Sequence, residues 1–143
     1  MATWKQGFYQ LRNPDKYVGD CNKVVFRSSW ELSMNRFLDN NTKILRWSSE
    51  EIFIPYIKPT DGKVHRYFPD YWVEYENRNG ELVQEILEVK PSNQVHPNEK
   101  RRLTEYDKIT YAINVSKWKA ATEFCKKRGI KFRLLTEKQM FTV

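Results

Sequence analysis

The sequence contains few cysteines, and their positions exclude two classes of small protein. Only Cys21 and Cys125 occur among 143 residues, and they do not form a C-x-x-C pair. Two such residues are too few for the disulfide framework of a small secreted domain, and they lack the spacing of a structural zinc site. We therefore expect a reducing, intracellular setting.

Long apolar runs and flexible linkers are also scarce. No run approaches the roughly 18 apolar residues that suggest a membrane span, and residues 1–6 lack the apolar stretch of a secretion signal. Glycine and proline number only 5 and 6, whereas 40% of the residues are hydrophobic, enough for a packed core. We expect a single domain over residues 1–143 with no membrane association. Residues 1–24 are expected to form an N-terminal segment that packs on this domain or extends from it.

The positive charge of the chain is concentrated in its last third. The formal net charge is +7, and residues 1–97 contain 13 basic and 13 acidic residues. Residues 98–133 contain 11 basic and 4 acidic residues. Such a segment predicts a surface for a polyanion, most commonly nucleic acid, while a solvated lysine-rich helix face is the alternative. The candidates for contacts with DNA phosphates are Lys108, Lys117, Lys119 and Lys127.

Hydrophobic spacing and turn signals predict a mixed α/β (α+β) fold, with a small mixed sheet flanked by helices. The expected helices cover residues 28–41, 98–113 and 116–128. The expected strands cover residues 24–26, 44–47, 52–56, 64–75 with a break at Pro69, 82–90 and 130–135. Ser28 and Glu31 have the spacing of a capping box at the start of the first helix. Asn98 is expected to cap the second helix, and Gly129 to end the third.

Pro69-Asp70 and Glu88-Val89-Lys90 place two carboxylates and one ammonium group in the predicted hairpin. Glu88 and Lys90 lie on the same face, because side chains alternate along a strand. A loop with an odd number of residues pairs positions whose numbers sum to 158, which sets Asp70 opposite Glu88 with Cβ atoms about 5 Å apart. A two-residue turn would place them on opposite faces unless a bulge near Pro69 restored the register.

Two carboxylates this close suit a hard divalent cation, because they repel each other unless a cation or proton lies between them. Mg²⁺ prefers oxygen ligands and keeps several waters, so Asp70, Glu88 and the backbone carbonyl of Val89 would supply part of its shell. The metal would polarise a phosphate and lower the pKa of a bound water. Lys90 would hold that water or neutralise charge on the phosphate. An ordinary sheet with cross-strand charge pairs is the alternative.

The triplet resembles the PD-(D/E)XK nuclease superfamily, and the expected order of elements is similar to the core of that superfamily. A longer series of matches, covering nearly the whole chain from about residue 8, resembles the head-completion nucleases of large contractile-tailed bacteriophages. The matching segments are Arg27–Leu32, Trp47–Glu50, Ile54–Tyr56, His65–Asp70, Asn114, Lys117–Trp118, Ala120–Ala121, Arg128–Gly129 and Thr136–Glu137. A more distant likeness is to endonucleases that cleave transposon ends.

The resemblance implies a metal-dependent DNA endonuclease that hydrolyses phosphodiester bonds, with Mg²⁺ as cofactor and Mn²⁺ as a substitute. Asp70 and Glu88 match the metal-binding carboxylates, and Lys90 matches the catalytic lysine. Glu31 matches the acidic residue that many members carry on the first helix, where it contacts a metal directly or through water. Capping of that helix together with Ser28 is the alternative role for Glu31.

The resemblance also implies a role in phage head completion and DNA packaging in the cytoplasm of the infected host. Phage head or portal-neck proteins are then further partners, with association with the virion and a dimeric state left open. A non-catalytic DNA-binding virion-assembly protein is the alternative, although retention of all three catalytic residue types favours an enzyme. An RNA-binding domain has less support, because no RRM, KH or zinc-knuckle signature is present. As for His65, it lies an odd number of positions before Asp70, so regular strand alternation places it on the face opposite Asp70.

Overall fold

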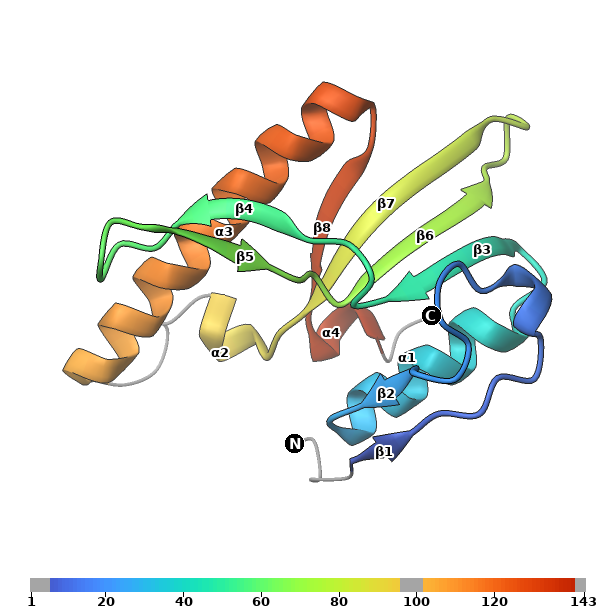
Figure 1. The fold of residues 1–143 in the computed structure, drawn as a ribbon, viewed down its shortest axis with the longest axis horizontal. Coiled ribbons are helices and arrows are strands. Elements are labelled where there is room, and N and C mark those ends of the chain that lie inside the picture. Colours follow the sequence, from blue (N-terminus) through green and yellow to red (C-terminus); the bar gives the residue numbers. More distant parts are fainter. Residues whose placement is uncertain (1–5, 96–101, 141–143) are drawn as a thin grey trace.

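The computed structural model describes residues 6–95 and 102–140, and it has the mixed α/β fold expected from the sequence (Figure 1). A four-stranded sheet with the order β3-β6-β7-β8 forms its centre. The first three strands are antiparallel, and β8 joins β7 in parallel. The strands are β3 (Ile44–Ser49), β6 (Tyr71–Glu76), β7 (Leu82–Val89) and β8 (Lys131–Leu135).

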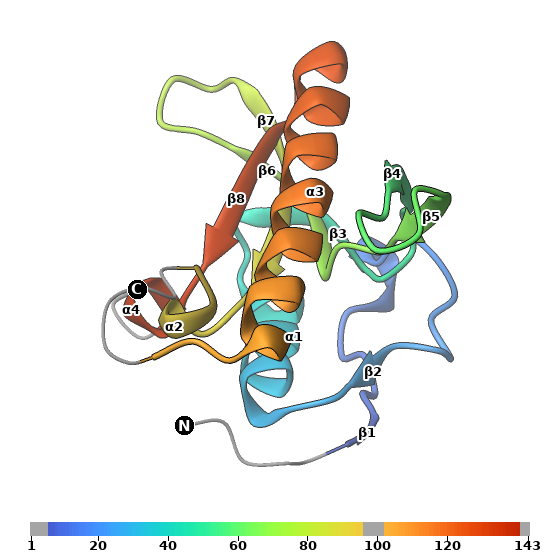
Figure 2. The same cartoon turned by 90° about the vertical axis from the view of Figure 1, so that its left-hand side faces the viewer.

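Two long helices cover opposite faces of this sheet (Figures 1 and 2). They are α1 (Ser29–Asn40) and α3 (Glu105–Arg128). Leu38 of α1 is buried in one core together with Leu87 of β7, while Ala121 of α3 is buried in a second core together with Ile86. Adjacent residues of a strand point to opposite faces, so β7 contributes to both cores. The strand β7 therefore lies between two packed layers.

The part of the chain that connects β3 to β6 forms a separate two-stranded arm. This arm lies beside α3 in both views (Figures 1 and 2). The arm consists of β4 (Ile54–Ile57) and β5 (Val64–Tyr67). The break expected at Pro69 is present, and it separates two strands that belong to different sheets. Proline has no N–H group for a sheet ladder, and the chain passes from the arm to the central sheet around Pro69.

The basic helix also differs from expectation, because residues 105–128 form one helix instead of two. Thr104 and Asp107 form the capping box at its start, and Asn98, the expected cap, lies outside the described residues. No proline or glycine interrupts the helix near residue 116, and serine is tolerated in a helix interior. Gly129 ends the helix in a left-handed conformation with φ of 68°, as expected.

The remaining elements are short. They are β1 (Gly7–Phe8), η1 (Pro14–Lys16), β2 (Val25–Phe26), α2 (Ser92–Val95) and α4 (Glu137–Met140). Within the two described ranges, no helix combines the length and the apolar character needed to cross a membrane.

The N-terminal segment is attached to α1 through Asp39. The Asp39 carboxylate accepts hydrogen bonds from the Tyr9 hydroxyl at 2.7 Å and from the backbone N–H groups of Arg12 and Asn13 at 2.8 and 3.0 Å. Burial raises the pKa of Asp39, but these hydrogen bonds outweigh burial and lower it overall. An ionised Asp39 therefore fixes the segment against the helix that carries Glu31.

Candidate active site

The β6–β7 hairpin has the odd-length loop that the predicted site requires. Residues 77–81 connect the strands, and the residue numbers of every pair in the ladder sum to 158. The side chain of Asn77 accepts hydrogen bonds from two backbone N–H groups of the loop, both at 2.9 Å. Asp70 directly precedes this ladder, and its backbone N–H donates a hydrogen bond to the Glu88 carboxylate. The predicted register is confirmed.

Asp70 and Glu88 are joined by hydrogen bonds that involve the backbone. The Asp70 N–H donates to the Glu88 carboxylate at 3.3 Å, and the Val89 N–H donates to the Asp70 carboxylate at 2.7 Å. The Lys90 ammonium nitrogen lies 3.5 Å from the nearer Glu88 carboxylate oxygen. The structure thus brings together the two carboxylates and the lysine of the predicted triplet.

The environment of Asp70 opposes its ionisation. Burial raises the pKa of Asp70 well above its usual range, and the neighbouring charges of Glu88 and then Glu31 raise it further. The Val89 N–H and the Lys90 ammonium act in the opposite direction but do not outweigh burial. Carboxylates that resist simultaneous ionisation form a site that a divalent cation would stabilise.

Glu88 has a similar environment and an unusual neighbour. Burial raises the pKa of Glu88, while the Lys90 ammonium and the Tyr67 hydroxyl lower it by smaller amounts. The Tyr67 hydroxyl is itself buried and, among the described residues, makes no hydrogen bond of acceptable geometry. A buried hydroxyl that interacts with Glu88 without a well-formed hydrogen bond is unfavourable in the protein alone. Its position beside Glu88 fits a site that receives another oxygen group, such as water or phosphate.

The donor atoms fit a hydrated divalent cation better than a closed metal centre. Asp70, Glu88 and the backbone carbonyl of Val89 offer only oxygen, the ligand type of hard cations. In residues 6–95 and 102–140, no three histidine, cysteine or acidic side chains converge closely enough to hold an ion by themselves. Water and substrate oxygens would complete the coordination of a cation bound between the two carboxylates.

Only the Ser28 half of the capping box expected at α1 is present, and the Glu31 side chain has other neighbours. The Ser28 hydroxyl accepts a hydrogen bond from the Glu31 N–H at 3.2 Å and so caps α1. Burial, followed by the charge of Glu50, raises the pKa of the Glu31 carboxyl, and the Arg27 N–H lowers it less. The side chain also raises the pKa of Asp70. The backbone of Glu31 therefore serves the cap, and its carboxyl lies near enough to Asp70 for its charge to raise the pKa of Asp70.

Glu50 is a neighbour of the site to which the sequence assigned no role. Its φ of 55° lies in the left-handed region, which is uncommon for a residue other than glycine. Its N–H donates to the Asp70 carbonyl at 3.0 Å, and its carboxylate pairs with Arg27 at 3.2 Å. Glu50 therefore fixes the backbone next to Asp70. The only sequence signal was its place in the Trp47–Glu50 match.

Lys117 also lies at this site, although the sequence placed it among surface lysines. It is half-buried, and its ammonium nitrogen lies 5.6 and 5.8 Å from the ring centroids of Tyr67 and Tyr56. Burial lowers its pKa, the nearby Lys90 lowers it further, and Glu88 raises it. Two lysines from distant parts of the chain therefore lie near Glu88, one directly after β7 and one on α3.

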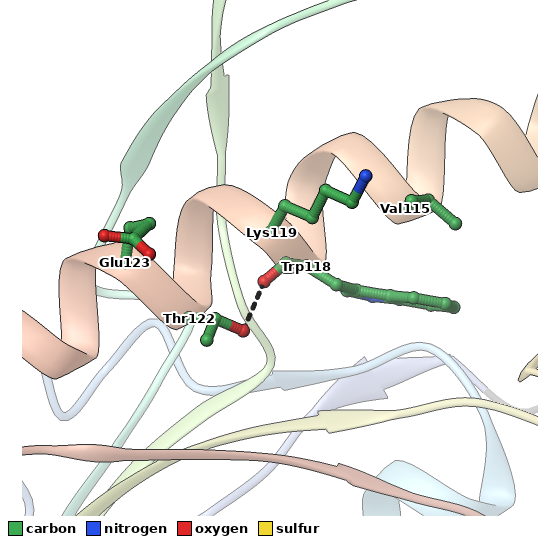
Figure 3. A pocket seen from close by; sticks show the side chains of 5 residues that line it. All are labelled: Val115, Trp118, Lys119, Thr122 and Glu123. Carbon is green, nitrogen blue, oxygen red and sulfur yellow. Dashed lines mark hydrogen bonds between the residues drawn. The ribbon is translucent and has the colours of Figure 1, made fainter.

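The other predicted DNA contacts are on the exposed surface of α3. Lys108, Lys119 and Lys127 are exposed, and Lys108 pairs with Glu105 at 3.5 Å. Lys119 lines a shallow pocket of about 420 Å³ whose lining residues all belong to α3 and include neither carboxylate of the site (Figure 3). The other residues of this pocket are Val115, Trp118, Thr122 and Glu123. The structure thus separates these three lysines from Lys117.

His65 is not part of the acidic cluster. It lies on β5, in the arm and outside the central sheet, and its imidazole nitrogen is 2.8 Å from the Asp61 carboxylate. The expected position on the face opposite Asp70 assumed one continuous strand, which the structure does not contain. His65 instead connects β5 to the turn at the tip of the arm.

Two comparisons with known proteins agree with this arrangement. The family model described as TnsA-like endonuclease N terminal matches residues 41–137, well over half of the chain. The chain therefore belongs to the TnsA-like endonuclease family. It is also 40% identical over 141 residues to the head completion nuclease of Enterobacteria phage T4, which covers 92% of this chain and 90% of that protein. The family match includes Asp70, Glu88 and Lys90 but begins after Glu31.

Proposed function

We propose that this protein is a Mg²⁺-dependent endonuclease that hydrolyses phosphodiester bonds of DNA during phage head completion, with Mn²⁺ able to replace Mg²⁺. The convergence of Asp70, Glu88 and Lys90 in a member of an endonuclease family is the observation that carries this proposal. Similarity to a head completion nuclease supports the biological step. The host cytoplasm, association with the virion, and head or portal-neck partners belong to the same proposal.

Asp70 and Glu88 would hold the cation together with the backbone carbonyl of Val89, and Glu31 would contact it directly or through water. When bound, the cation polarises the phosphate and activates the water that attacks it. The Val89 N–H fixes the Asp70 carboxylate, and the Asp70 N–H orients that of Glu88. These residues therefore prepare the site through the backbone as well as through their charges.

The lysines act on the phosphate. Lys90, 3.5 Å from Glu88, would donate hydrogen bonds to the charge that grows on the phosphate oxygens. Lys117 would contact the same phosphate from α3, held against the rings of Tyr56 and Tyr67. The exposed lysines Lys108, Lys119 and Lys127 would neutralise flanking phosphates and so contribute salt-dependent affinity.

Cleavage of supercoiled plasmid DNA tests this proposal. The intact protein should nick the plasmid with Mg²⁺ or Mn²⁺ but not with EDTA, and Asp70→Ala prepared in the same way should not nick it. The matched control Glu76→Ala removes an exposed carboxylate at the far end of β6 and should cut at the parent rate. DNA binding without any cutting by the intact protein would instead identify a non-catalytic DNA-binding assembly protein.

A further inference from the structure

The arm formed by β4 and β5 has an apolar outer face that no described part of the chain covers. A sheet packed on one side normally has polar residues on the other. The inward residues Ile54, Tyr56 and Tyr67 are buried in the core that includes α3. On the outward face, Ile57 and Val64 are directly paired, yet they are 62% and 70% exposed. Such a face on a small two-stranded arm indicates a binding surface.

Two phenylalanines continue this outer face to the acidic site. Phe53 and Phe68 are 45% and 46% exposed, and their ring centroids are 6.0 Å apart. Phe53 directly precedes β4, and Phe68 is two residues before Asp70, so the Cα atoms of Phe68 and Asp70 are at most about 7 Å apart. The guanidinium of Arg66 lies over the Phe53 ring, 4.8 Å from its centroid. An exposed aromatic pair with a cation therefore stands next to the carboxylates.

The charges of the arm favour nucleic acid over a second copy of this chain as the occupant. Arg66 lies on the outward face, and Lys58 and Lys63 flank the turn at the end of the arm, where the one acidic residue, Asp61, is engaged with His65. Two identical arms would bring like charges together, which disfavours self-association. A nucleotide offers an apolar aromatic face next to an anionic phosphate, and so complements rings bordered by cations.

We propose that Phe53, Phe68 and Arg66 form a platform on which a nucleobase stacks beside the phosphodiester that is cut. This proposal rests on the nuclease function and assigns its substrate class as DNA with an unpaired nucleotide at the cut, such as single strands, flaps or gaps. A base inside a continuous duplex is already stacked on both sides, so it must leave the helix before it can reach the platform. Fully paired DNA is therefore the poorer substrate.

Binding without metal tests the platform independently of cutting. A single-stranded oligonucleotide with 2-aminopurine at successive positions is titrated with protein in EDTA, and compared with the matched duplex. Stacking should quench the fluorescence at one position of the single strand and leave the duplex signal unchanged. Phe68→Ala and Phe53→Ala should remove the quenching and weaken single-strand binding about 5- to 100-fold. Phe37→Ala, which truncates a comparably exposed ring on α1, should change neither.

Cleavage of two substrates with the same sequence completes the test. With Mg²⁺, the parent protein should cut a gapped or flapped duplex at least about tenfold faster than the continuous duplex, and Phe68→Ala should reduce this ratio towards one. Phe68→Leu keeps an apolar side chain without the aromatic face, so it gives the same answer if the alanine variant does not fold. Phe68→Trp should restore the preference.

Equal cutting of both substrates by the parent protein overturns the platform, as does unchanged 2-aminopurine quenching in the folded Phe68 variants. Absence of cutting on every substrate has a different meaning, because it contradicts the nuclease function itself. The fluorescence experiment contains no metal and still decides whether a base stacks on the arm.

Discussion

The backbone N–H of Asp70 donates a hydrogen bond to the carboxylate of Glu88, over 3.3 Å, so the two acidic residues are joined before any ion binds. The Val89 N–H supports the arrangement from the other side by donating to Asp70 at 2.7 Å. Because backbone groups hold both carboxylates, their positions depend little on charge. Variants that remove the charge of a carboxylate but keep its shape can therefore show its effect on cleavage separately from its effect on stability.

Asp70→Asn and Glu88→Gln should abolish cutting and leave the fold intact. Removing a metal-binding carboxylate should slow cleavage about 100-fold or more. The melting temperature without metal should stay the same or rise, because a neutral amide avoids the cost of burying a charge beside another carboxylate. Plasmid cleavage and thermal melts measure the two effects, with Glu76→Gln as an exposed control. Cutting by either variant at the parent rate would show that the metal ligands are assigned wrongly.

Mg²⁺ should stabilise the folded protein more at pH 8 than at pH 5. The folded-state pKa values of Asp70 and Glu88 are raised above the unfolded values near 4. Their contribution to stability is therefore complete below pH 4 and is lost as the pH rises through the raised values. A cation competes with the bound protons, so it binds more tightly as they leave.

Melting curves with and without Mg²⁺ at several pH values test this prediction. At a concentration of 100 times the dissociation constant, Mg²⁺ should add about 2.7 kcal/mol to the free energy of unfolding. Asp70→Asn should lose most of this increment at every pH. An equal increment in the parent protein and in this variant would place the ion elsewhere.

Ser28→Ala and Glu31→Gln should have opposite effects on stability and on cutting. Ser28 caps α1, whereas the Glu31 carboxyl lies near Asp70. The loss of the Ser28 cap should lower the free energy of unfolding by about 1 kcal/mol with little change in cutting. Glu31→Gln should reduce cutting at limiting Mg²⁺ while stability without metal stays the same or increases. If Glu31→Gln destabilises the protein and cuts normally, Glu31 serves only the helix.

Lys117→Met should reduce the rate of cutting, and Lys119→Met should not. Methionine keeps the apolar contact with Tyr56 and Tyr67, so this substitution removes mainly the charge near the phosphate. Single-turnover cleavage at saturating protein should fall about tenfold or more for Lys117→Met. For Lys119→Met only affinity should fall, with the salt slope of binding reduced by about one. Equal effects of the two substitutions would show that Lys117 contributes only to the general positive charge of the surface.

Local signals were sufficient to predict the register of the β6–β7 hairpin and most of the central sheet. The register of the β6–β7 hairpin depends on one loop, and the acidic residues lie within or next to its strands. Strand alternation and loop length together brought Asp70 opposite Glu88, and the structure has the same register. The cap of α1 at Ser28 was equally local and is also confirmed.

The division of residues 64–76 between two sheets could not be predicted in the same way. β5 and β6 follow each other closely in sequence and both consist of residues that favour strands. Only the pairing of β5 with β4, and of β6 with β3 and β7, separates them. The position of Lys117 has the same origin, since charge counts do not show which side of a helix faces a distant arm.

The five-residue connection 77–81 lies at the opposite end of the hairpin from the acidic residues, yet its length decides which side chains meet there. Losing or gaining a single residue would rotate one strand's side chains to the other surface and part Asp70 from Glu88. A change of two residues preserves the alternation. The types of residue at this tip should therefore vary freely. Insertions and deletions there among active relatives should involve even numbers of residues.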